Sequence, residues 1–519
     1  MNRKTSIEQI RETVLWDMLV VGGGATGLGI AVDAAKRGFK VLLLEKYDFA
    51  KGTSSRSTKL VHGGVRYLAQ GNIKLVIEAL RERGFLLKNA PHLTRVQQFI
   101  IPAYSYWQKW FYGVGLTVYD LLSNKLSLGK PKILGKKSMV SAMPSIEKKK
   151  LKGGISYMDG QFDDSRLAIA LAQTATDLGA SLVNYCGVVA LLKDNSKITG
   201  IEAFDEISGE TYSINSKVVI NATGVFVDQI IGMDETETPA MVMPSQGVHL
   251  VVDKKFFPGT GALMIPKTTD GRVLFALPWH DSVVIGTTDT ALNMISEEPI
   301  ALEEEIEFIL LNFNQYNEIK LTRKDILSVF AGLRPLVKTS NTGSTSVASR
   351  DHTIMVSKSN LITITGGKWT TYRKMAKDAV NNASFVGKLP VIKCTTRNLM
   401  LHGYSEQIKY GDPLSSFGSD GEKILQMMAL RPELAEKIHP LFDYTKAEVV
   451  WSVQQEMAMF IEDYLARRSR MLFLNAKAAI ESASIVAKLM AAEMGKDDAW
   501  EQDQIQEFAE LAKGYIAKV

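Results

Sequence analysis

A glycine-rich turn near the amino terminus is the first feature of the sequence with a clear chemical use. It follows residues 17–21, an aspartate and four apolar residues that predict a buried strand, and it leads into a helical pattern. Gly22 allows the tight turn, Gly24 lets a pyrophosphate approach the backbone, and Gly27 lets helix and strand pack closely. A second apolar run ends at Glu45, whose carboxylate can accept hydrogen bonds from ribose hydroxyls. This order of features predicts a dinucleotide-binding unit with the pyrophosphate at the amino terminus of the helix.

The segment at residues 52–67 favours FAD over NAD as the dinucleotide. It is rich in glycine, hydroxyl groups and positive charge, which suits a loop that covers a second stretch of phosphate and the edge of a flavin. Its apolar residues, and a predicted helix at about 73–89, argue against a disordered linker. The residues expected to bind the cofactor here are Thr53, Ser54, Ser55, Ser57, Lys59, Leu60, His62, Gly63 and Gly64.

Several stretches of the chain resemble the signatures of FAD-dependent glycerol-3-phosphate dehydrogenases. They are residues 53–68, an arginine motif at 331–336, a looser motif at 349–352, a flavin motif at 365–373, the pair 275–279 and 285–290, and the segment 453–470. The resemblance spans nearly the whole chain. The aerobic, single-subunit bacterial type is the closer match, because the sequence shows neither a cysteine-rich carboxyl end nor an EF-hand pattern.

The resemblance implies a reaction, a fold and a cellular setting. The reaction is oxidation of sn-glycerol 3-phosphate to dihydroxyacetone phosphate by hydride transfer to FAD, with electrons passed on to a membrane quinone. The fold is a two-domain flavoprotein related to the amino-acid oxidases, followed by a helical domain. The setting is peripheral attachment to the cytoplasmic membrane.

The predicted fold combines an α/β FAD-binding domain of the Rossmann type, an α+β substrate cap built on an antiparallel sheet, and a carboxyl-terminal helical domain. Strand candidates between residues 248 and 286 support the cap sheet, and helical spacing at 445–465 and 476–494 supports the helical domain. The expected boundaries are 16–90, 155–230 and 349–385 for the FAD-binding domain, 91–154 and 231–348 for the cap, and 391–519 for the helical domain.

Fixed cations are the first requirement for a phosphorylated alcohol as substrate, because the planar fork of arginine pairs with phosphate oxygens. By resemblance, Arg334 and Arg350 are the leading substrate ligands, and Arg66 and Tyr67 are further candidates beside the flavin. Lys368 precedes a predicted helix whose amino terminus can stabilise negative charge on the flavin, and its ammonium can add to this or touch substrate. A surface ion pair is the alternative for any isolated arginine, and the motif weakens that alternative most for Arg334.

A proton acceptor for the substrate hydroxyl is the second requirement, and histidine suits this role near neutral pH. His62 in the flavin motif and His249 at the start of a predicted cap strand are the candidates. A hydrogen-bonded structural histidine is the alternative for each. An arginine-assisted base, with Arg334 lowering the pKa of the alcohol, also stays open.

Further cofactor contacts are expected outside the first two motifs. The turn at residues 221–224 is of a kind that lies beside the dinucleotide in flavoproteins. The residues expected to contribute are Val188, Ala222, Gly224, Gly367, Lys368 and Thr370. Covalent or noncovalent attachment of the FAD stays open.

Composition narrows the remaining classes of function. The chain has 519 residues, a net charge of +5 and two cysteines, Cys186 and Cys394, which form no metal-binding or disulfide pattern. No nucleic-acid-binding module is visible, and no metal site is expected. The sequence shows no signal-peptide core and no run of 18 apolar residues, so we expect neither a signal peptide nor a transmembrane helix. The resemblance implies a cytoplasmic protein at the inner face of the membrane. A homodimer is one of the assemblies left open.

An aromatic segment and clusters of basic residues bear on membrane contact. Around Lys109 lie four aromatic residues, Trp107, Trp110, Phe111 and Tyr112. They would suit a membrane interface, but a buried helix is the favoured interpretation. Basic clusters at 136–150 and 467–470 are interpreted as solvated faces, and the first of them would also suit anionic lipid.

Three other functions stay open. A flavin oxidase of the same fold would use oxygen as acceptor, and release of peroxide would reveal it. A 2-hydroxyacid or amino-acid oxidoreductase would bind a carboxylate with the same arginines, and would not require a phosphate on the substrate. A non-catalytic flavin-binding module would show no flavin bleaching with any substrate.

Overall fold

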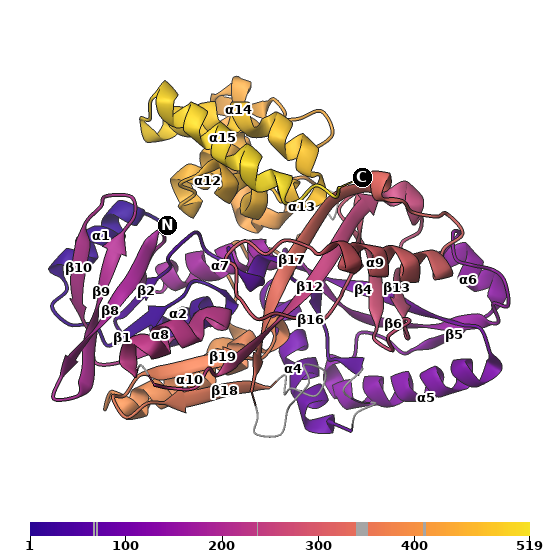
Figure 1. Cartoon of the computed structure of the whole chain (residues 1–519), viewed down its shortest axis with the longest axis horizontal. Helices are drawn as coiled ribbons and strands as arrows, with labels where there is room; N and C mark the ends of the chain where they lie inside the picture. Colours follow the sequence, from indigo (N-terminus) through magenta and orange to yellow (C-terminus); the bar gives the residue numbers. More distant parts are fainter. Residues whose placement is uncertain (66–67, 69–70, 236, 339–350, 408–411, 519) are drawn as a thin grey trace.

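The first sheet of the molecule carries the glycine-rich turn at its centre. The computed structural model describes all residues except 66–67, 69–70, 236, 339–350, 408–411 and 519 (Figure 1). The strand order is β18-β19-β11-β1-β2-β7, and the described pairs are parallel except for β18 with β19. The strands are β1 (Met18–Val21), β2 (Val41–Leu44), β7 (Ser181–Val183), β11 (Val219–Asn221), β18 (His352–Val356) and β19 (Ile362–Gly366).

Both faces of this sheet are covered, which explains why its strands read as continuous apolar runs. Successive side chains of a strand point to opposite faces. Met18 and Val20 therefore join a core with the helices, whereas Leu19 and Val21 join a core with a small second sheet. The helices are α2 (Ala25–Lys36), α7 (Asp164–Asp177) and α10 (Tyr372–Val386). The other face carries α1 (Arg3–Glu12), β8 (Cys186–Asp194), β9 (Lys197–Asp205) and β10 (Thr211–Asn215).

The cap is built on a ten-stranded sheet whose order begins β16-β12-β15-β14-β13-β4-β6-β3, with β17 paired to β12 and β5 to β6. Most described pairs are antiparallel, and β13 with β4 is parallel. The strands are β3 (Leu60–Val61), β4 (Thr94–Ala103), β5 (Lys132–Leu134), β6 (Gly153–Phe162), β12 (Val242–Asp253), β13 (Ala262–Ile265), β14 (Leu274–Trp279), β15 (Ser282–Gly286), β16 (Thr290–Ala291) and β17 (Ile326–Val337). Residues 155–162, predicted in the FAD-binding domain, therefore lie in the cap sheet.

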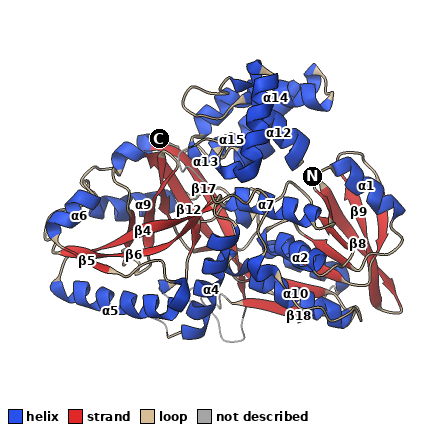
Figure 2. Cartoon of the chain, turned by 180° about the vertical axis from the view of Figure 1, so that it is seen from behind, coloured by secondary structure: helices blue, strands red, loops and turns tan. Residues whose placement is uncertain are grey.

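Helices flank the cap sheet (Figure 2). They are α4 (Ile73–Asn89), α5 (Tyr106–Ser123), α6 (Lys136–Ala142) and α9 (Glu303–Tyr316). Phe313 of α9 and Met139 of α6 share a buried core with the inward side chains of β12 to β15. The short helix α8 (Val227–Asp234) lies on the FAD-binding domain, where Ile230 packs into the core with the small second sheet.

The carboxyl-terminal residues form a helical unit that packs on the cap through Trp279 and Phe330. Its helices are α11 (Gly421–Leu430), α12 (Lys446–Glu456), α13 (Met471–Leu474), α14 (Ala476–Met494) and α15 (Asp498–Lys513). The helix predicted at 445–465 is shorter, because Met457 adopts a left-handed φ of 54°. The Asp463 carboxylate then accepts the backbone N–H groups of Met459 and Phe460, and a π-helical turn covers Asp463–Arg468.

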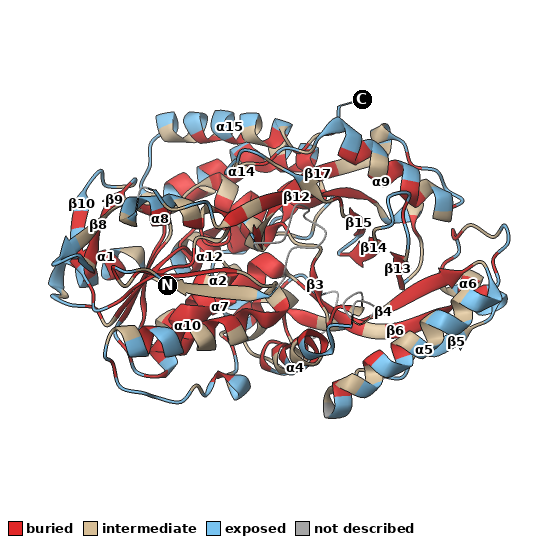
Figure 3. Cartoon of the chain, turned by 60° about the horizontal axis from the view of Figure 1, so that its bottom comes forward, coloured by how far each residue is buried: buried red, intermediate tan, exposed pale blue. Residues whose placement is uncertain are grey.

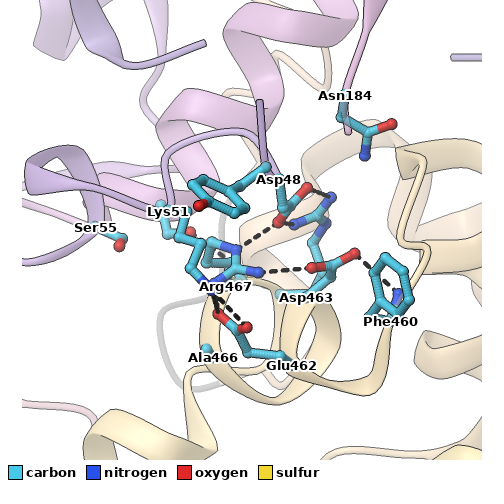
Figure 4. Close-up of polar contacts among 12 residues, drawn as sticks. Asp48, Lys51, Ser55, Asn184, Phe460, Glu462, Asp463, Ala466 and Arg467 are labelled. Carbon is cyan, nitrogen blue, oxygen red and sulfur yellow. Dashed lines mark hydrogen bonds and ion pairs between the residues drawn. The ribbon is translucent and has the colours of Figure 1, made fainter. Parts of the chain in front are cut away.

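Arginines of this turn are buried against the FAD-binding domain, so their interpretation as a solvated face is wrong. Arg467 donates to Asp48 as well as to Glu462 and Asp463, at 2.6 Å for each of the last two (Figure 4). Arg468 binds both carboxylate oxygens of Asp48. Arg470, also in the predicted basic cluster, is equally buried. Burial of these charges is compensated because each guanidinium has a carboxylate partner.

The aromatic helix α5 is exposed, which also corrects the sequence interpretation. The side chains of Trp107 and Trp110 are 77% and 72% exposed, and Phe111 is also exposed. Only the opposite side of the helix, with Leu116 and Tyr119, is buried against the protein. Figure 3 shows α5 as an outer helix with exposed residues along its length.

Candidate active site

One large cavity lies between the FAD-binding domain and the cap. Its volume is about 810 Å³, within the range of about 300–1,000 Å³ found for ligand sites. Its walls come from the carboxyl ends of β1, β2, β11 and β19, from residues 50–62, and from the cap strands β12, β14 and β17. Ligands bind at these strand ends in open parallel sheets.

The glycine turn has the close approaches that its predicted roles require. Gly22 has a φ of +107°, and a Cβ there would lie 2.8 Å from the carbonyl oxygen of Ala222. A Cβ at Gly27 would lie 1.8 Å from the carbonyl oxygen of Gly22, so Gly27 serves the packing of α2 on β1. Gly24 is the N-cap of α2, and it brings the helix amino terminus to the cavity wall. This cradle fits the pyrophosphate of a dinucleotide.

Glu45 follows β2 and faces the same cavity. Its carboxylate accepts the backbone N–H groups of Gly23 and Tyr47. Burial raises the pKa of Glu45 above its ordinary value, and those two hydrogen bonds oppose the rise. A carboxylate offers about four lone-pair positions, so it can also accept from the hydroxyls of a ribose.

The first and last flavin motifs meet along one wall, although about 300 residues separate them. The Ser54 hydroxyl accepts the N–H of Ala25 at 2.9 Å, and the Ser54 carbonyl accepts the indole N–H of Trp369 at 2.8 Å. The backbone N–H of His62 donates to the Thr370 hydroxyl at 3.2 Å. Thr370 therefore joins the two motifs.

Most of the predicted cofactor residues line the cavity. Those that do are Gly22, Gly24, Glu45, Thr53, Ser54, Ser57, Leu60, His62, Val188, Ala222, Gly224, Gly367, Lys368 and Thr370. The others do not line it, and they are Gly27, Ser55, Lys59, Gly63 and Gly64. The prediction for Lys59 is corrected most clearly, because its ammonium donates to Asp164 and to two backbone carbonyls inside the protein.

Arg334 lies on the cap strand β17, and its side chain lines the cavity. Its guanidinium donates to the Thr287 hydroxyl at 3.0 Å and to the Thr288 carbonyl at 2.9 Å, and it lies 3.5 Å from Asp289. A Cβ at Gly247 would lie 2.3 Å from this guanidinium, so the glycine makes room for it. The fork is therefore held in one orientation, which reduces the entropy lost when it binds an anion.

His249, on β12, lies against the loop that carries Thr58. Its Nε2 is 2.9 Å from the Thr58 hydroxyl, and its ring stacks on Phe330 with centroids 4.8 Å apart. Burial lowers the pKa of His249 well below its ordinary value, and the cations of Lys59 and Arg334 lower it further. The imidazole is therefore neutral at neutral pH, the form that accepts a proton.

The remaining predicted residues divide into two groups. Lys368 lines the cavity directly before the short helical turn Trp369–Thr371 and α10, as the sequence predicted. His62 also lines it. Arg66, Tyr67 and Arg350 lie outside the described residues.

Sequence reasoning gave no role to several residues of the cavity wall. They are Thr58, Arg272, Thr287 and Asp289. Thr287 and Asp289 belong to the motif at 285–290, so that motif was the available signal. Arg272 pairs with Asp270 before β14, and its guanidinium lies 5.3 Å from the ring centroid of Phe308. No local pattern marked Arg272 as a cavity residue.

Comparison with known proteins agrees with this geometry. The family described as FAD dependent oxidoreductase matches residues 17–373, and the C-terminal domain of alpha-glycerophosphate oxidase matches residues 360–501. The mitochondrial glycerol-3-phosphate dehydrogenase of Bos taurus is 37% identical over 97% of this chain and 74% of its own length. That of Schizosaccharomyces pombe is 37% identical over 99% of this chain and 89% of its own.

This chain belongs to the FAD-dependent glycerol-3-phosphate dehydrogenases. A solved structure of the Bacillus halodurans glycerol-3-phosphate dehydrogenase complexed with FAD has a TM-score of 0.81 and 30% identity. The match covers 99% of this chain and 97% of the Bacillus halodurans chain. The Rossmann-type domain, antiparallel cap and helical carboxyl-terminal domain are thus the architecture of this dehydrogenase family, and FAD is its cofactor.

Proposed function

We propose that this protein oxidises sn-glycerol 3-phosphate to dihydroxyacetone phosphate and passes the electrons to a membrane quinone. One observation carries the proposal: a single cavity joins the dinucleotide cradle at Gly22 and Glu45 to the cations Arg334 and Lys368 and to the neutral His249. The relatives named above as glycerol-3-phosphate dehydrogenases support the choice of substrate. Bound FAD supplies the hydride acceptor for the carbinol carbon.

The chain's own residues bind and orient the substrate. Arg334 and Lys368 provide positive charge for the phosphate or for the alkoxide that develops on oxidation. The contacts of Arg334 with Thr287 and Thr288 fix its direction before substrate arrives. Each charge-assisted hydrogen bond contributes about 1.5–3 kcal/mol, which is enough to favour the phosphorylated alcohol over glycerol.

His249 is the proton acceptor that the geometry supports best. It is neutral, lies on the cavity wall, and is held by Thr58 and Phe330. Its Nδ1 is buried and makes no hydrogen bond to any of the described residues. His62 is the second candidate because it lines the same cavity beside Thr370.

An anaerobic titration tests the reaction and the acceptor together. Adding glycerol 3-phosphate to the purified protein without oxygen is expected to remove most of the visible flavin absorption, whereas glycerol is not. Adding a short-chain quinone is then expected to restore the colour much faster than air does. Retention of the colour with glycerol 3-phosphate would refute the substrate, and fast reoxidation by air with release of peroxide would identify an oxidase.

The exposed face of α5 supports the proposed membrane contact. Its tryptophans and Phe111 point away from the protein, and the exposed Lys136 and Lys137 of α6 follow in the same domain. Aromatic side chains with nearby lysines suit the surface of an anionic bilayer. Among the described helices, none combines the length and apolar character needed to cross a bilayer. We therefore propose peripheral contact with the cytoplasmic membrane.

Replacing Trp107 and Trp110 together by serine is expected to lower binding to anionic vesicles at least about tenfold, because both indoles lose their burial in the interface. Co-sedimentation with phosphatidylglycerol vesicles measures this. Phe385→Ser is the matched control, since Phe385 is also exposed but lies on α10. Unchanged binding of the double variant would place the membrane contact elsewhere.

A further inference from the structure

Lys59 is a buried cation directly behind the wall of the cavity. Its side chain has no exposed surface, and its backbone has a left-handed φ of 63°. Its two neighbours, Thr58 and Leu60, both line the cavity. The backbone at Lys59 therefore turns one side chain into the protein between two that face the ligand space.

All three hydrogens of the Lys59 ammonium have partners inside the protein. The partners are the carbonyls of Ser55 and Ser57, each at 2.9 Å, and the Asp164 carboxylate at 2.8 Å. Asp164 also accepts the backbone N–H and the hydroxyl of Ser57. Lys59 and Asp164 thus hold the loop that carries Thr58 from its inner side.

Aromatic rings from two domains enclose the same ammonium. The ring centroids of Trp279, Phe330 and Phe473 lie 5.4, 5.0 and 5.6 Å from its nitrogen. Trp279 and Phe330 belong to the cap, and Phe473 belongs to α13 of the helical domain. Such rings stabilise a cation that is removed from water.

Two short paths connect Lys59 with His249. The first runs along the backbone to the adjacent residue Thr58, whose hydroxyl lies within hydrogen-bonding distance of Nε2 of His249, at 2.9 Å. The second runs through Phe330, whose ring lies near the Lys59 ammonium and stacks on the imidazole at an interplanar angle of 15°. The histidine therefore meets both the loop that Lys59 holds and the ring beside its charge.

We propose that Lys59 is a positioning residue for His249, which it serves by holding Thr58 against the imidazole and by placing a fixed positive charge behind Phe330. The assignment of His249 as proton acceptor rests on the function proposed above. The charge also keeps the imidazole in its neutral form, since Lys59 follows burial as the second cause of the lowered pKa of His249. Burial lowers the pKa of Lys59 itself to about 8, and its attraction to Asp164 opposes this.

The other charged groups around His249 are few among the described residues. Arg334 lies on the neighbouring strand β17 and is the third cause of the lowered pKa. On its other neighbour, β15, Gly286 faces the imidazole ring and brings no charge. The groups next in line are the partners of these cations, namely Asp289 for Arg334, and Asp164 with Arg470 for Lys59.

The test compares Lys59→Met with Lys59→Arg. The pKa of His249 is measured on the substrate-free holoenzyme from hydrogen–deuterium exchange at imidazole Cε1, read by mass spectrometry. Loss of the charge is expected to raise this pKa, because the cation disfavours the protonated imidazole. The acid limb of kcat/KM against pH is expected to move up with it. Lys59→Arg keeps the charge and is expected to keep both values.

The proposal would be overturned by an unchanged His249 pKa in a folded Lys59→Met protein, or by an equal rise in the methionine and arginine variants. The exchange measurement needs no substrate, so it stands apart from any failure of the glycerol 3-phosphate titration. If Lys59→Met does not fold, Thr58→Val tests the hydroxyl contact separately. That variant is expected to lower kcat about tenfold or more with little change in KM, and Thr58→Ser is expected to restore it. Unchanged kcat in Thr58→Val would also overturn the proposal.

Discussion

Replacing Arg334 by methionine is expected to lower kcat/KM for glycerol 3-phosphate by about 10²–10⁴-fold while the protein still binds FAD. The guanidinium lines the cavity and has a fixed direction set by Thr287 and Thr288. Two charge-assisted hydrogen bonds to substrate, at about 1.5–3 kcal/mol each, would amount to that factor. Steady-state kinetics gives the loss, and the visible spectrum reports the FAD content. Arg334→Lys is expected to recover part of the activity, because it restores the charge but not the planar fork.

The matched control is an arginine that does not line the cavity. Arg323 pairs with Glu303 and Glu307 near the surface of the cap, so Arg323→Gln is expected to leave kcat/KM within about twofold. A stability effect is checked by thermal melting, since Arg334→Met also leaves Asp289 without this cation. A folded Arg334→Met protein with FAD bound and nearly normal kcat/KM would remove Arg334 from the substrate site.

The sequence predicted the parts of the site that depend on local order along the chain. Gly22, Gly24 and Glu45 were found because a nucleotide cradle needs a strand, a tight turn and a helix in immediate succession. The same local rule placed Lys368 before its helix. The resemblance assigned both segments to the flavin, but it did not predict the hydrogen bond between Ser54 and Trp369, which depends on the tertiary fold.

Burial of charge is what the sequence did not reveal. Lys59 sits in a segment rich in hydroxyl groups and glycine, and only the three-domain surroundings show that it points inward. The cluster at residues 467–470 reads as a hydrophilic face, because the carboxylates that pair with it lie in part more than 400 positions earlier, at Asp48. Conversely, the aromatic residues of α5 favour a buried helix when only the sequence is considered. In the structure they are exposed, because no other part of the described chain covers this face of the helix.

The buried ions between the FAD-binding and helical domains form a single connected network (Figure 4). Arg467 binds Asp48 from one domain and Glu462 and Asp463 from the other. Lys51 also binds Glu462, at 2.7 Å. Asp48 and Lys51 lie on either side of Ala50, which lines the cavity. Their ion pairs with the helical domain therefore hold the loop that faces the cofactor. The domain is therefore coupled to the site, although none of its described residues lines the cavity.

Arg467→Met is expected to lower the free energy of unfolding by about 3–5 kcal/mol, because it leaves buried carboxylates without their shared cation. Urea denaturation followed by circular dichroism measures this free energy. The fluorescence of released FAD is expected to rise over the same range of urea concentration, because the loop that contains Ala50 lines the cofactor cavity. Arg431→Gln is the control, since Arg431 pairs with Glu433 and Glu493 at the surface and is expected to cost less than about 1 kcal/mol. Equal stabilities of the two variants would mean that water or a shifted side chain replaces the buried guanidinium, and that the network does not fasten the domains together.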